Sequence, residues 1–217
     1  MLALLLDIDG TLLDTFDAIL EAMNVALAEF RVRPLTAEEL RPLIGMPVER
    51  QMKMLRDMEG PVVDTIADRY YEVFHGLVDR GLRPYPGVPE TLASLAGRPI
   101  TTMSTRRREE ARHMLQVVGL EPYFTVIVGG DEVPRPKPYP DLPRHAARAL
   151  GVPVDRSVVV GDSPVDILAG RSAGAWAVAA MYGYGTPASL REAKAHAAIS
   201  SFPELPAVLD DLETRQQ

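Results

Sequence analysis

From Pro84 onward, short apolar runs alternate with segments whose apolar residues recur every three or four positions. The short runs cover 100–103, 125–128, 157–161, 176–181 and 197–199, and an earlier run covers 3–9. The periodic segments cover 88–95, 107–117, 142–150 and 165–172. Strands that alternate with helices pair in parallel through right-handed crossovers, and helices then cover both faces of the sheet. The alternation therefore predicts an α/β fold built on a doubly wound parallel sheet.

Between the first apolar run and Pro84 the pattern is helical throughout. Apolar periodicity predicts helices over 16–30, 37–42, 48–58 and 62–78, and Thr36 with Glu39 has the spacing of a capping box. An all-helical block that interrupts a sheet after its first strand indicates a separate lid. We expect a Rossmann-like core from residues 1–15 and 84–217 and a helical cap from residues 16–83. The linkers lie near 14–16 and 81–86.

Composition excludes several classes of site and partner. The 217-residue chain is 47% hydrophobic and 24% charged, as is usual for globular proteins. Its net charge of -7 argues against a surface that neutralises nucleic-acid phosphates. The absence of cysteine excludes disulfides, zinc-thiolate sites and thiol nucleophiles. The first strand leads directly into Asp7 and Asp9, and no run reaches roughly 20 apolar residues, so we expect no signal peptide, no membrane partner and a cytoplasmic location.

Polar side chains follow the predicted strands at the points where these strands end. The first strand closes with Asp7-Ile-Asp-Gly-Thr11, where alternation sends the carboxylates of Asp7 and Asp9 in different directions and Gly10 lets the backbone bend around a ligand. The other clusters are Ser104-Thr105, Lys137 in a proline-rich loop, and Gly161-Asp-Ser-Pro-Val-Asp166. Ligands of open parallel sheets bind at the carboxyl ends of the strands, so we expect these clusters to form one site.

The clustered residue types indicate phosphate chemistry. Carboxylates that converge on one edge repel each other unless a hard cation lies among them, and oxygen ligands suit Mg²⁺. An ammonium group, a hydroxyl and free backbone N–H groups can then compensate the charge of a phosphoryl group in transfer. The chain has three lysines against 20 arginines, which favours a chemical role for Lys137.

Taken in order, four segments resemble the motifs of the haloacid dehalogenase-like hydrolase superfamily. They are Asp7-Ile-Asp-Gly-Thr-Leu-Leu-Asp14, Ser104, Lys137-Pro-Tyr-Pro-Asp141 and Gly161-Asp-Ser-Pro-Val-Asp166. The resemblance runs from residue 5 to about 183, and the helical insertion is similar to that of the phosphoglycolate phosphatase-like branch. It implies a Mg²⁺-dependent phosphatase that hydrolyses a small phosphorylated metabolite, such as a phosphoglycolate-like monoester, through an aspartyl-phosphate intermediate.

The resemblance also implies catalytic and metal-binding roles. Asp7 would be the nucleophile, and Asp9 would be the general acid that then activates water as a base. Mg²⁺ would be held by the Asp7 carboxylate, the backbone carbonyl of Asp9 and the Asp162 carboxylate. Asp166 would orient the metal ligands or a bound water.

The phosphoryl oxygens would be bound by Ser104 and Lys137. Lys137 would also offset the charge on Asp7, and backbone N–H groups of Gly10 and Thr105 would assist, together with that of Asp9. The family often has Thr-Asn where this chain has Ser104-Thr105. A serine hydroxyl can replace that of threonine, whereas Thr105 lacks the amide.

Related functions differ at single positions. Dehalogenases lack the second aspartate, which is present here as Asp9, and phosphomutases usually have a histidine where this chain has Ile19. Phosphonoacetaldehyde hydrolases need a lysine shortly after Gly45, where Met46 stands instead. A phospho-aspartate sensor would leave the lid unexplained. Pyrophosphate, sugar phosphates and nucleoside monophosphates stay open as substrates.

The cap is expected to reach the core site through the loop Leu43–Val48, around Gly45. A lid that closes over the site removes bulk water and selects the substrate. The sequence is compatible with a monomer or a homodimer.

Two groups of basic residues receive structural interpretations. Arg106, Arg107 and Arg108, followed by Glu109 and Glu110, predict a solvated helix start with internal ion pairs. The four histidines have no spacing typical of a zinc site or a catalytic triad, so we assign them no function. They are His75, His113, His145 and His196.

Overall fold

The computed structural model describes residues 1–216. It contains a five-stranded sheet in the order β4-β1-β5-β6-β7, and every neighbouring pair is parallel. This arrangement confirms the predicted doubly wound α/β fold. The strands are β1 (Ala3–Leu6), β4 (Ile100–Thr102), β5 (Ser157–Gly161), β6 (Trp176–Ala180) and β7 (Ala197–Ile199).

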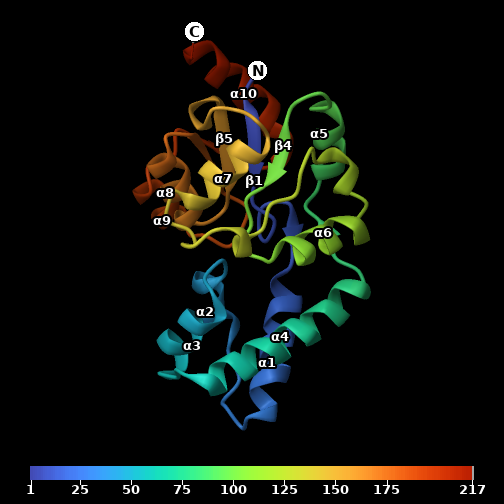
Figure 1. Ribbon diagram of the computed structural model, residues 1–217, viewed down its shortest axis with the longest axis vertical. Helices are drawn as coiled ribbons and strands as arrows, with labels where there is room; N and C mark the ends of the chain where they lie inside the picture. The colour runs from blue at the N-terminus through green and yellow to red at the C-terminus, as the bar shows by residue number, and fades with distance from the viewer. Residues whose placement is uncertain (217) are drawn as a thin grey trace.

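Helices cover both faces of this sheet (Figure 1). Strand alternation sends Leu4 and Leu6 into one core with α5, α6 and α10, whereas Leu5 packs with α7 in the core of the other face. Ala177 and Ala179 of β6 pack against α8 and α9 in a third cluster. These helices are α5 (Val88–Ser94), α6 (Arg108–Val117), α7 (Asp141–Ala149), α8 (Pro164–Ala173), α9 (Pro187–Glu192) and α10 (Leu205–Arg215).

The strand expected over 125–128 does not form, which corrects the sequence-based prediction. Only an isolated bridge joins Val126 to Thr101. The Thr102 hydroxyl accepts from the Val128 N–H at 2.7 Å and donates to the Val128 carbonyl at 2.6 Å. A side chain of β4 thus satisfies backbone groups that a further strand would have satisfied with its backbone.

A helical insertion follows β1 and lies beyond the carboxyl end of the sheet (Figure 1). It contains α1 (Phe16–Glu29), α2 (Ala37–Leu40), α3 (Val48–Arg56) and α4 (Pro61–Asp79). The predicted capping box is present, since Thr36 and Glu39 exchange hydrogen bonds at the start of α2. At the base of the insertion, β2 (Leu13–Asp14) pairs antiparallel with β3 (Arg83–Pro84).

We propose that residues 16–83 act as a cap and that residues 1–15 and 84–217 form the core. The two chain crossings between these parts are held together by the β2–β3 pair, so the cap is attached at one point. No helix within residues 1–216 is both long enough and apolar enough to cross a membrane.

The position of β1 between β4 and β5 predicts a large cost for truncating one of its side chains. Leu5 is fully buried in the strand, whereas Leu168 on α8 is 42% exposed. We expect Leu5→Ala to lower the free energy of unfolding by about 2–5 kcal/mol, because it leaves a cavity between β1 and α7. Leu168→Ala serves as the matched control and should change it by about 0.5 kcal/mol. Urea unfolding measures both, and equal effects would contradict this assignment of the core.

Candidate active site

A buried cluster of three carboxylates and one lysine lies at the carboxyl ends of β1 and β5. The Lys137 ammonium is 3.1 Å from Asp7 Oδ1 and 2.5 Å from Asp166 Oδ1. Asp162 lies beside them, and carboxylate oxygens of Asp7, Asp162 and Asp166 are all within 4.8 Å of one another. The structure therefore brings together four of the residues that the sequence places at three separate strand ends.

Local structure fixes the orientation of the Asp162 and Asp166 carboxylates in this cluster. Asp166 lies in the first turn of α8, where its Oδ2 accepts from the Ser163 N–H at 3.0 Å and the Ser163 hydroxyl at 2.6 Å. Asp162 accepts from the Thr11 hydroxyl at 3.0 Å and from the Tyr184 N–H at 2.7 Å. Because both acids also hold the turn after β5, their positions follow from the fold.

The cluster holds more negative charge than Lys137 can neutralise. Burial raises the pKa of Asp7 well above its usual value, against the lowering effect of Lys137. Burial, followed by the charge of Asp166, raises the pKa of Asp162 to about 7. Three oxygen donors in close proximity, with one lysine against them, fit a hard divalent cation.

Gly10 permits the close approach of the first turn to this cluster. Its φ of 81° lies in the left-handed region. A Cβ at this position would collide with the Asp162 carboxylate and the Tyr184 ring. Both the backbone conformation and the space therefore require glycine.

Asp9 points away from the carboxylate cluster and binds Arg106. The guanidinium donates from Nε to Asp9 Oδ2 at 2.8 Å and from Nη2 to Oδ1 at 3.0 Å. Burial by itself raises the pKa of Asp9, but Arg106 outweighs this effect and holds the pKa below its usual value. The two carboxylates of Asp7 and Asp9 thus occupy opposite electrostatic environments, although only Ile8 separates them.

The position of Arg106 corrects the expectation of a solvated arginine run. Its side chain is 7% exposed and lies at 3.8 Å from the centroid of the Phe74 ring on α4. One expected feature is present, because Arg106 pairs with Glu110 four residues later at 3.1 Å. Arg106 immediately follows the Ser104-Thr105 cluster, and this adjacency was the sequence signal that could have identified it.

Thr15 and Tyr184 are further site residues that the sequence analysis missed. The Thr15 hydroxyl is 2.6 Å from Asp9 Oδ1, and the Thr15 N–H donates to the Tyr184 hydroxyl at 2.7 Å. Tyr184 also donates its N–H to Asp162, so one residue after β6 contacts both ends of the site. Tyr184 lies shortly after the end of a predicted strand, and this position was the sequence signal that could have identified it as a site residue.

Ser104 and Thr105 lie beside Asp9 and Arg106. Ser104 is fully buried, and its hydroxyl accepts from the Arg106 N–H at 3.2 Å. No hydrogen bond within residues 1–216 joins the Ser104 side chain to the carboxylate cluster. Thr105 lines a neighbouring cavity, and the Lys137–Pro138 peptide bond is cis.

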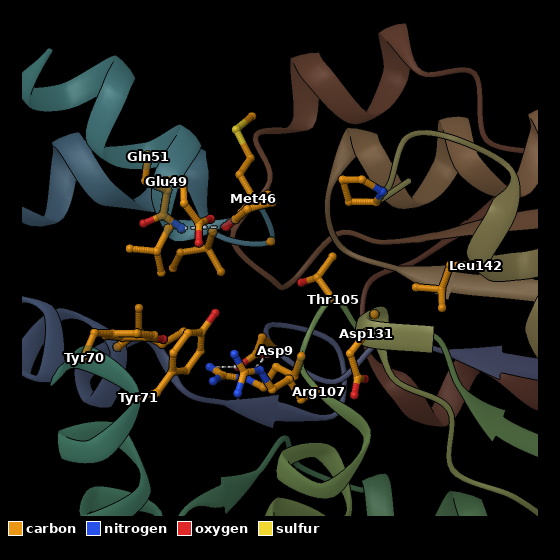
Figure 2. A pocket seen from close by; sticks show the side chains of 18 of the residues that line it. Asp9, Met46, Glu49, Gln51, Tyr70, Tyr71, Thr105, Arg107, Asp131 and Leu142 are labelled. Atoms are coloured by element: carbon orange, nitrogen blue, oxygen red, sulfur yellow. Dashed lines mark hydrogen bonds and ion pairs between the residues drawn. The ribbon is translucent and has the colours of Figure 1, made fainter. Parts of the chain in front are cut away.

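This cavity of about 330 Å³ lies between the cap and the core and receives Asp9, Thr105 and Arg106 from the core side. The cap loop Ile44–Val48 lines its opposite wall, where Gln51 donates to the Met46 carbonyl at 2.9 Å. Figure 2 shows Met46, Glu49 and Gln51 facing Tyr70, Tyr71 and Asp9 across the opening. The predicted cap loop therefore faces the core site.

Comparison with known proteins identifies the family to which the chain belongs. Residues 4–180 match the model of the haloacid dehalogenase-like hydrolase family. The chain belongs to this family. It is 33% identical over 216 residues to a phosphoglycolate phosphatase of Cupriavidus necator, covering 95% of this chain and 92% of the relative. It is 29% identical over 222 residues to the phosphoglycolate phosphatase of Neisseria meningitidis, covering 99% and 94%.

A solved structure of CbbY from Rhodobacter sphaeroides in complex with xylulose-(1,5)bisphosphate has the same fold. The TM-score is 0.83 at 26% identity, and the match covers 94% of this chain and 96% of that one. The family and the branch that contains phosphoglycolate phosphatases agree with the resemblance seen in the motifs.

The raised pKa of Asp162 predicts how stability depends on pH without metal. A carboxyl whose pKa rises from 3.8 to about 7 on folding binds more protons in the folded state, so stability is lost as pH rises between these values. The pKa shifts of Asp9, downward, and of Lys137, upward, act outside this range. We expect metal-free protein to be less stable at about pH 8 than at about pH 5, and Asp162→Asn to lose part of this dependence, because the raised pKa of Asp7 acts in the same direction.

Urea unfolding with a chelator at the two pH values measures this effect. Mg²⁺ should restore more stability at the higher pH, where the carboxylates are ionised. A wild-type protein whose stability is equal at both pH values would contradict the expectation.

Proposed function

We propose that this protein is a Mg²⁺-dependent phosphatase that hydrolyses a small phosphorylated metabolite through an aspartyl-phosphate intermediate. The proposal rests on one observation above all. Asp7 lies against Lys137 and next to Asp162 and Asp166 at the end of β1, and Asp9, two residues later, lines a cavity under the cap. A carboxylate held beside an ammonium group, at the edge where parallel sheets bind ligands, supports attack by Asp7 on a phosphoryl group.

In this mechanism the Asp7 carboxylate attacks phosphorus and the ester oxygen leaves. Because Arg106 keeps Asp9 ionised, Asp9 first leaves the guanidinium and takes up a proton from solvent. It donates this proton to the leaving oxygen and later takes a proton from the water that cleaves the aspartyl-phosphate. Lys137 and the Ser104 hydroxyl bind phosphoryl oxygens, assisted by backbone N–H groups of Asp9, Gly10 and Thr105. Lys137 also neutralises part of the charge on Asp7.

The Mg²⁺ ion would be held by the carboxylates of Asp7 and Asp162 and by the backbone carbonyl of Asp9, with Asp166 orienting ligands. When bound, it supplies charge neutralisation at the phosphoryl oxygens. The surplus of buried carboxylate over ammonium supports this assignment.

The size of the cavity supports a small substrate, since about 330 Å³ accommodates a compact metabolite rather than a polymer. The relatives are named for phosphoglycolate, and the CbbY structure holds a bisphosphate. Both compounds carry a second anionic group in addition to the reacting phosphate. A phosphoglycolate-like monoester is therefore the substrate that we favour, with pyrophosphate, sugar phosphates and nucleotides as alternatives.

The test is phosphate release from a panel of these compounds with Mg²⁺. We expect Asp7→Asn and a chelator each to abolish release, and Asp9→Asn to lower kcat by about 10²- to 10⁴-fold. Asp68→Asn on the exposed face of α4 makes the same chemical change away from the site and should retain activity. If wild type hydrolysed no ester while a phosphodonor labelled Asp7, a phospho-aspartate sensor would replace this proposal.

A further inference from the structure

Arg106 is a buried arginine, and only some of its N–H donors form hydrogen bonds with other residues. Of the five guanidinium N–H groups, two donate to Asp9 and one donates to Glu110 at 3.1 Å. The remaining two donate to no protein atom within residues 1–216. Arg106 also lines the cavity between the cap and the core, so these donors belong to a residue of the cavity wall.

The pair with Arg106 holds the carboxylate that must act on the leaving oxygen. Both Asp9 oxygens accept from the guanidinium, and Oδ1 also accepts from the Thr15 hydroxyl at 2.6 Å. Asp9 must leave this arrangement to reach a substrate. Glu110 would then be the one anionic partner of Arg106 among the described residues, and four of the five buried N–H groups would lack an acceptor, which favours another anion in place of Asp9.

The surroundings of Arg106 keep its guanidinium in the cavity when Asp9 moves. The Phe74 ring of α4 stacks on it at 3.8 Å, and Glu110 anchors it from α6, which begins two residues after Arg106. Asp9 and Arg106 both line this cavity, so a substrate whose phosphate meets Asp7 and whose leaving oxygen meets Asp9 would extend its other groups into it. The planar fork of a guanidinium matches a carboxylate or a phosphate in two parallel hydrogen bonds.

We propose that Arg106 binds the second anionic group of the substrate, and that this group takes the place of the Asp9 carboxylate on the guanidinium. The exchange frees Asp9 to turn toward the leaving oxygen. This inference rests on the proposed function and narrows its substrates to small phosphates that carry a carboxylate or a second phosphate. Such compounds would activate their own hydrolysis, whereas simple alkyl phosphates would leave Asp9 held by Arg106.

The experiment compares substrates that differ in the second anion. Phosphoglycolate is paired with ethyl phosphate, and pyrophosphate with methyl phosphate, so the two pairs distinguish a carboxylate from a phosphate. We expect wild type to favour the doubly anionic member of at least one pair. Arg106→Gln should lower the ratio of kcat/KM values within that pair by at least about tenfold, because it removes two charge-assisted hydrogen bonds.

Two further variants separate binding from stability. Arg106→Lys keeps the charge but loses the fork, and it should recover part of the ratio. Arg112→Gln on α6, where the arginine pairs with Glu109 at the surface, should leave the ratio unchanged. Thermal unfolding verifies that each variant is folded.

The outcomes distinguish this inference from the proposed function. Equal losses on both members of each pair in Arg106→Gln would show that Arg106 only positions Asp9, and would overturn the inference alone. A wild type that hydrolyses ethyl phosphate as well as phosphoglycolate, and methyl phosphate as well as pyrophosphate, would do the same. A wild type that hydrolyses no ester would overturn the proposed function, and the inference with it.

An independent cluster lies where α4 of the cap meets α6 of the core. His75 and Asp79 are one turn apart on α4, and His113 comes from α6. The two imidazole rings stack with centroids 4.3 Å apart and planes 6° apart. His113 Nε2 lies 2.8 Å from Asp79 Oδ1. One possible ligand atom from each of the three residues lies within 4.8 Å of those from the other two. Sequence spacing missed this cluster because its histidines come from different helices.

We infer that His75, Asp79 and His113 bind a divalent transition metal such as Zn²⁺. Two imidazoles and one carboxylate suit zinc, copper or nickel, whereas the all-oxygen set at the active site suits Mg²⁺. Asp79 is the last residue of α4, shortly before β3 returns the chain to the core. A metal at this point would link the two helices and restrict movement of the cap.

Calorimetric titration of Zn²⁺ in the presence of excess Mg²⁺ tests this site. We expect His113→Gln and His75→Gln each to lower the Zn²⁺ affinity at least about tenfold, since each removes one of three ligands. His145→Gln on α7 is the matched control and should bind as wild type does. Binding that is unchanged in both cluster variants, or no binding to wild type, would overturn the inference.

Discussion

The burial of three carboxylates around the single ammonium group of Lys137 is the interaction on which the rest of the site depends. Buried charges of one sign are tolerated only with counter-charge and hydrogen-bond donors. Here the donors come from the fold itself, through the first turn of α8, the Thr11 hydroxyl and the Tyr184 N–H. These contacts tie the ends of β1, β5 and β6 to one point, and their incomplete charge balance is what makes the point suitable for a metal ion and a phosphate.

The carboxylates of Asp7 and Asp9 lie on one short segment but in different electrostatic environments. Asp7 faces the acidic cluster, where burial raises its pKa, whereas Asp9 faces Arg106 and the cavity, where the guanidinium lowers its pKa. The difference follows from the direction in which each side chain leaves the end of β1. It separates the group that we propose as the nucleophile from the group that we propose as the general acid and base, and only the second of these lines the cavity under the cap. Arg106, packed on Phe74 of α4, connects that group to the lid.

Local patterns predicted most of the fold, and the failures have physical causes. Short apolar runs located the five strands of the sheet, helical periodicity located the helices of the insertion, and residue spacing located the capping box at Thr36. The strand expected over 125–128 failed because the Thr102 side chain satisfies the backbone of Val128, an exchange that no apolar pattern reports. The helices α9 and α10 were not predicted; the first spans only Pro187–Glu192, and the second begins beside a further proline.

By itself the sequence determined that the strand ends carrying Asp7 and Asp162 would meet, because parallel strands place all their carboxyl ends at one edge of the sheet. Lys137 reaches this edge from the loop before α7, although the strand expected ahead of that loop does not form. The sequence also determined the cap, because a helical block cannot join a sheet that it interrupts. Only the tertiary structure decided that Arg106 turns inward to Asp9 instead of outward to solvent, and that His75 meets His113. Both contacts join residues from distant segments, and a local pattern of charge or polarity does not contain the direction in which a side chain leaves its backbone.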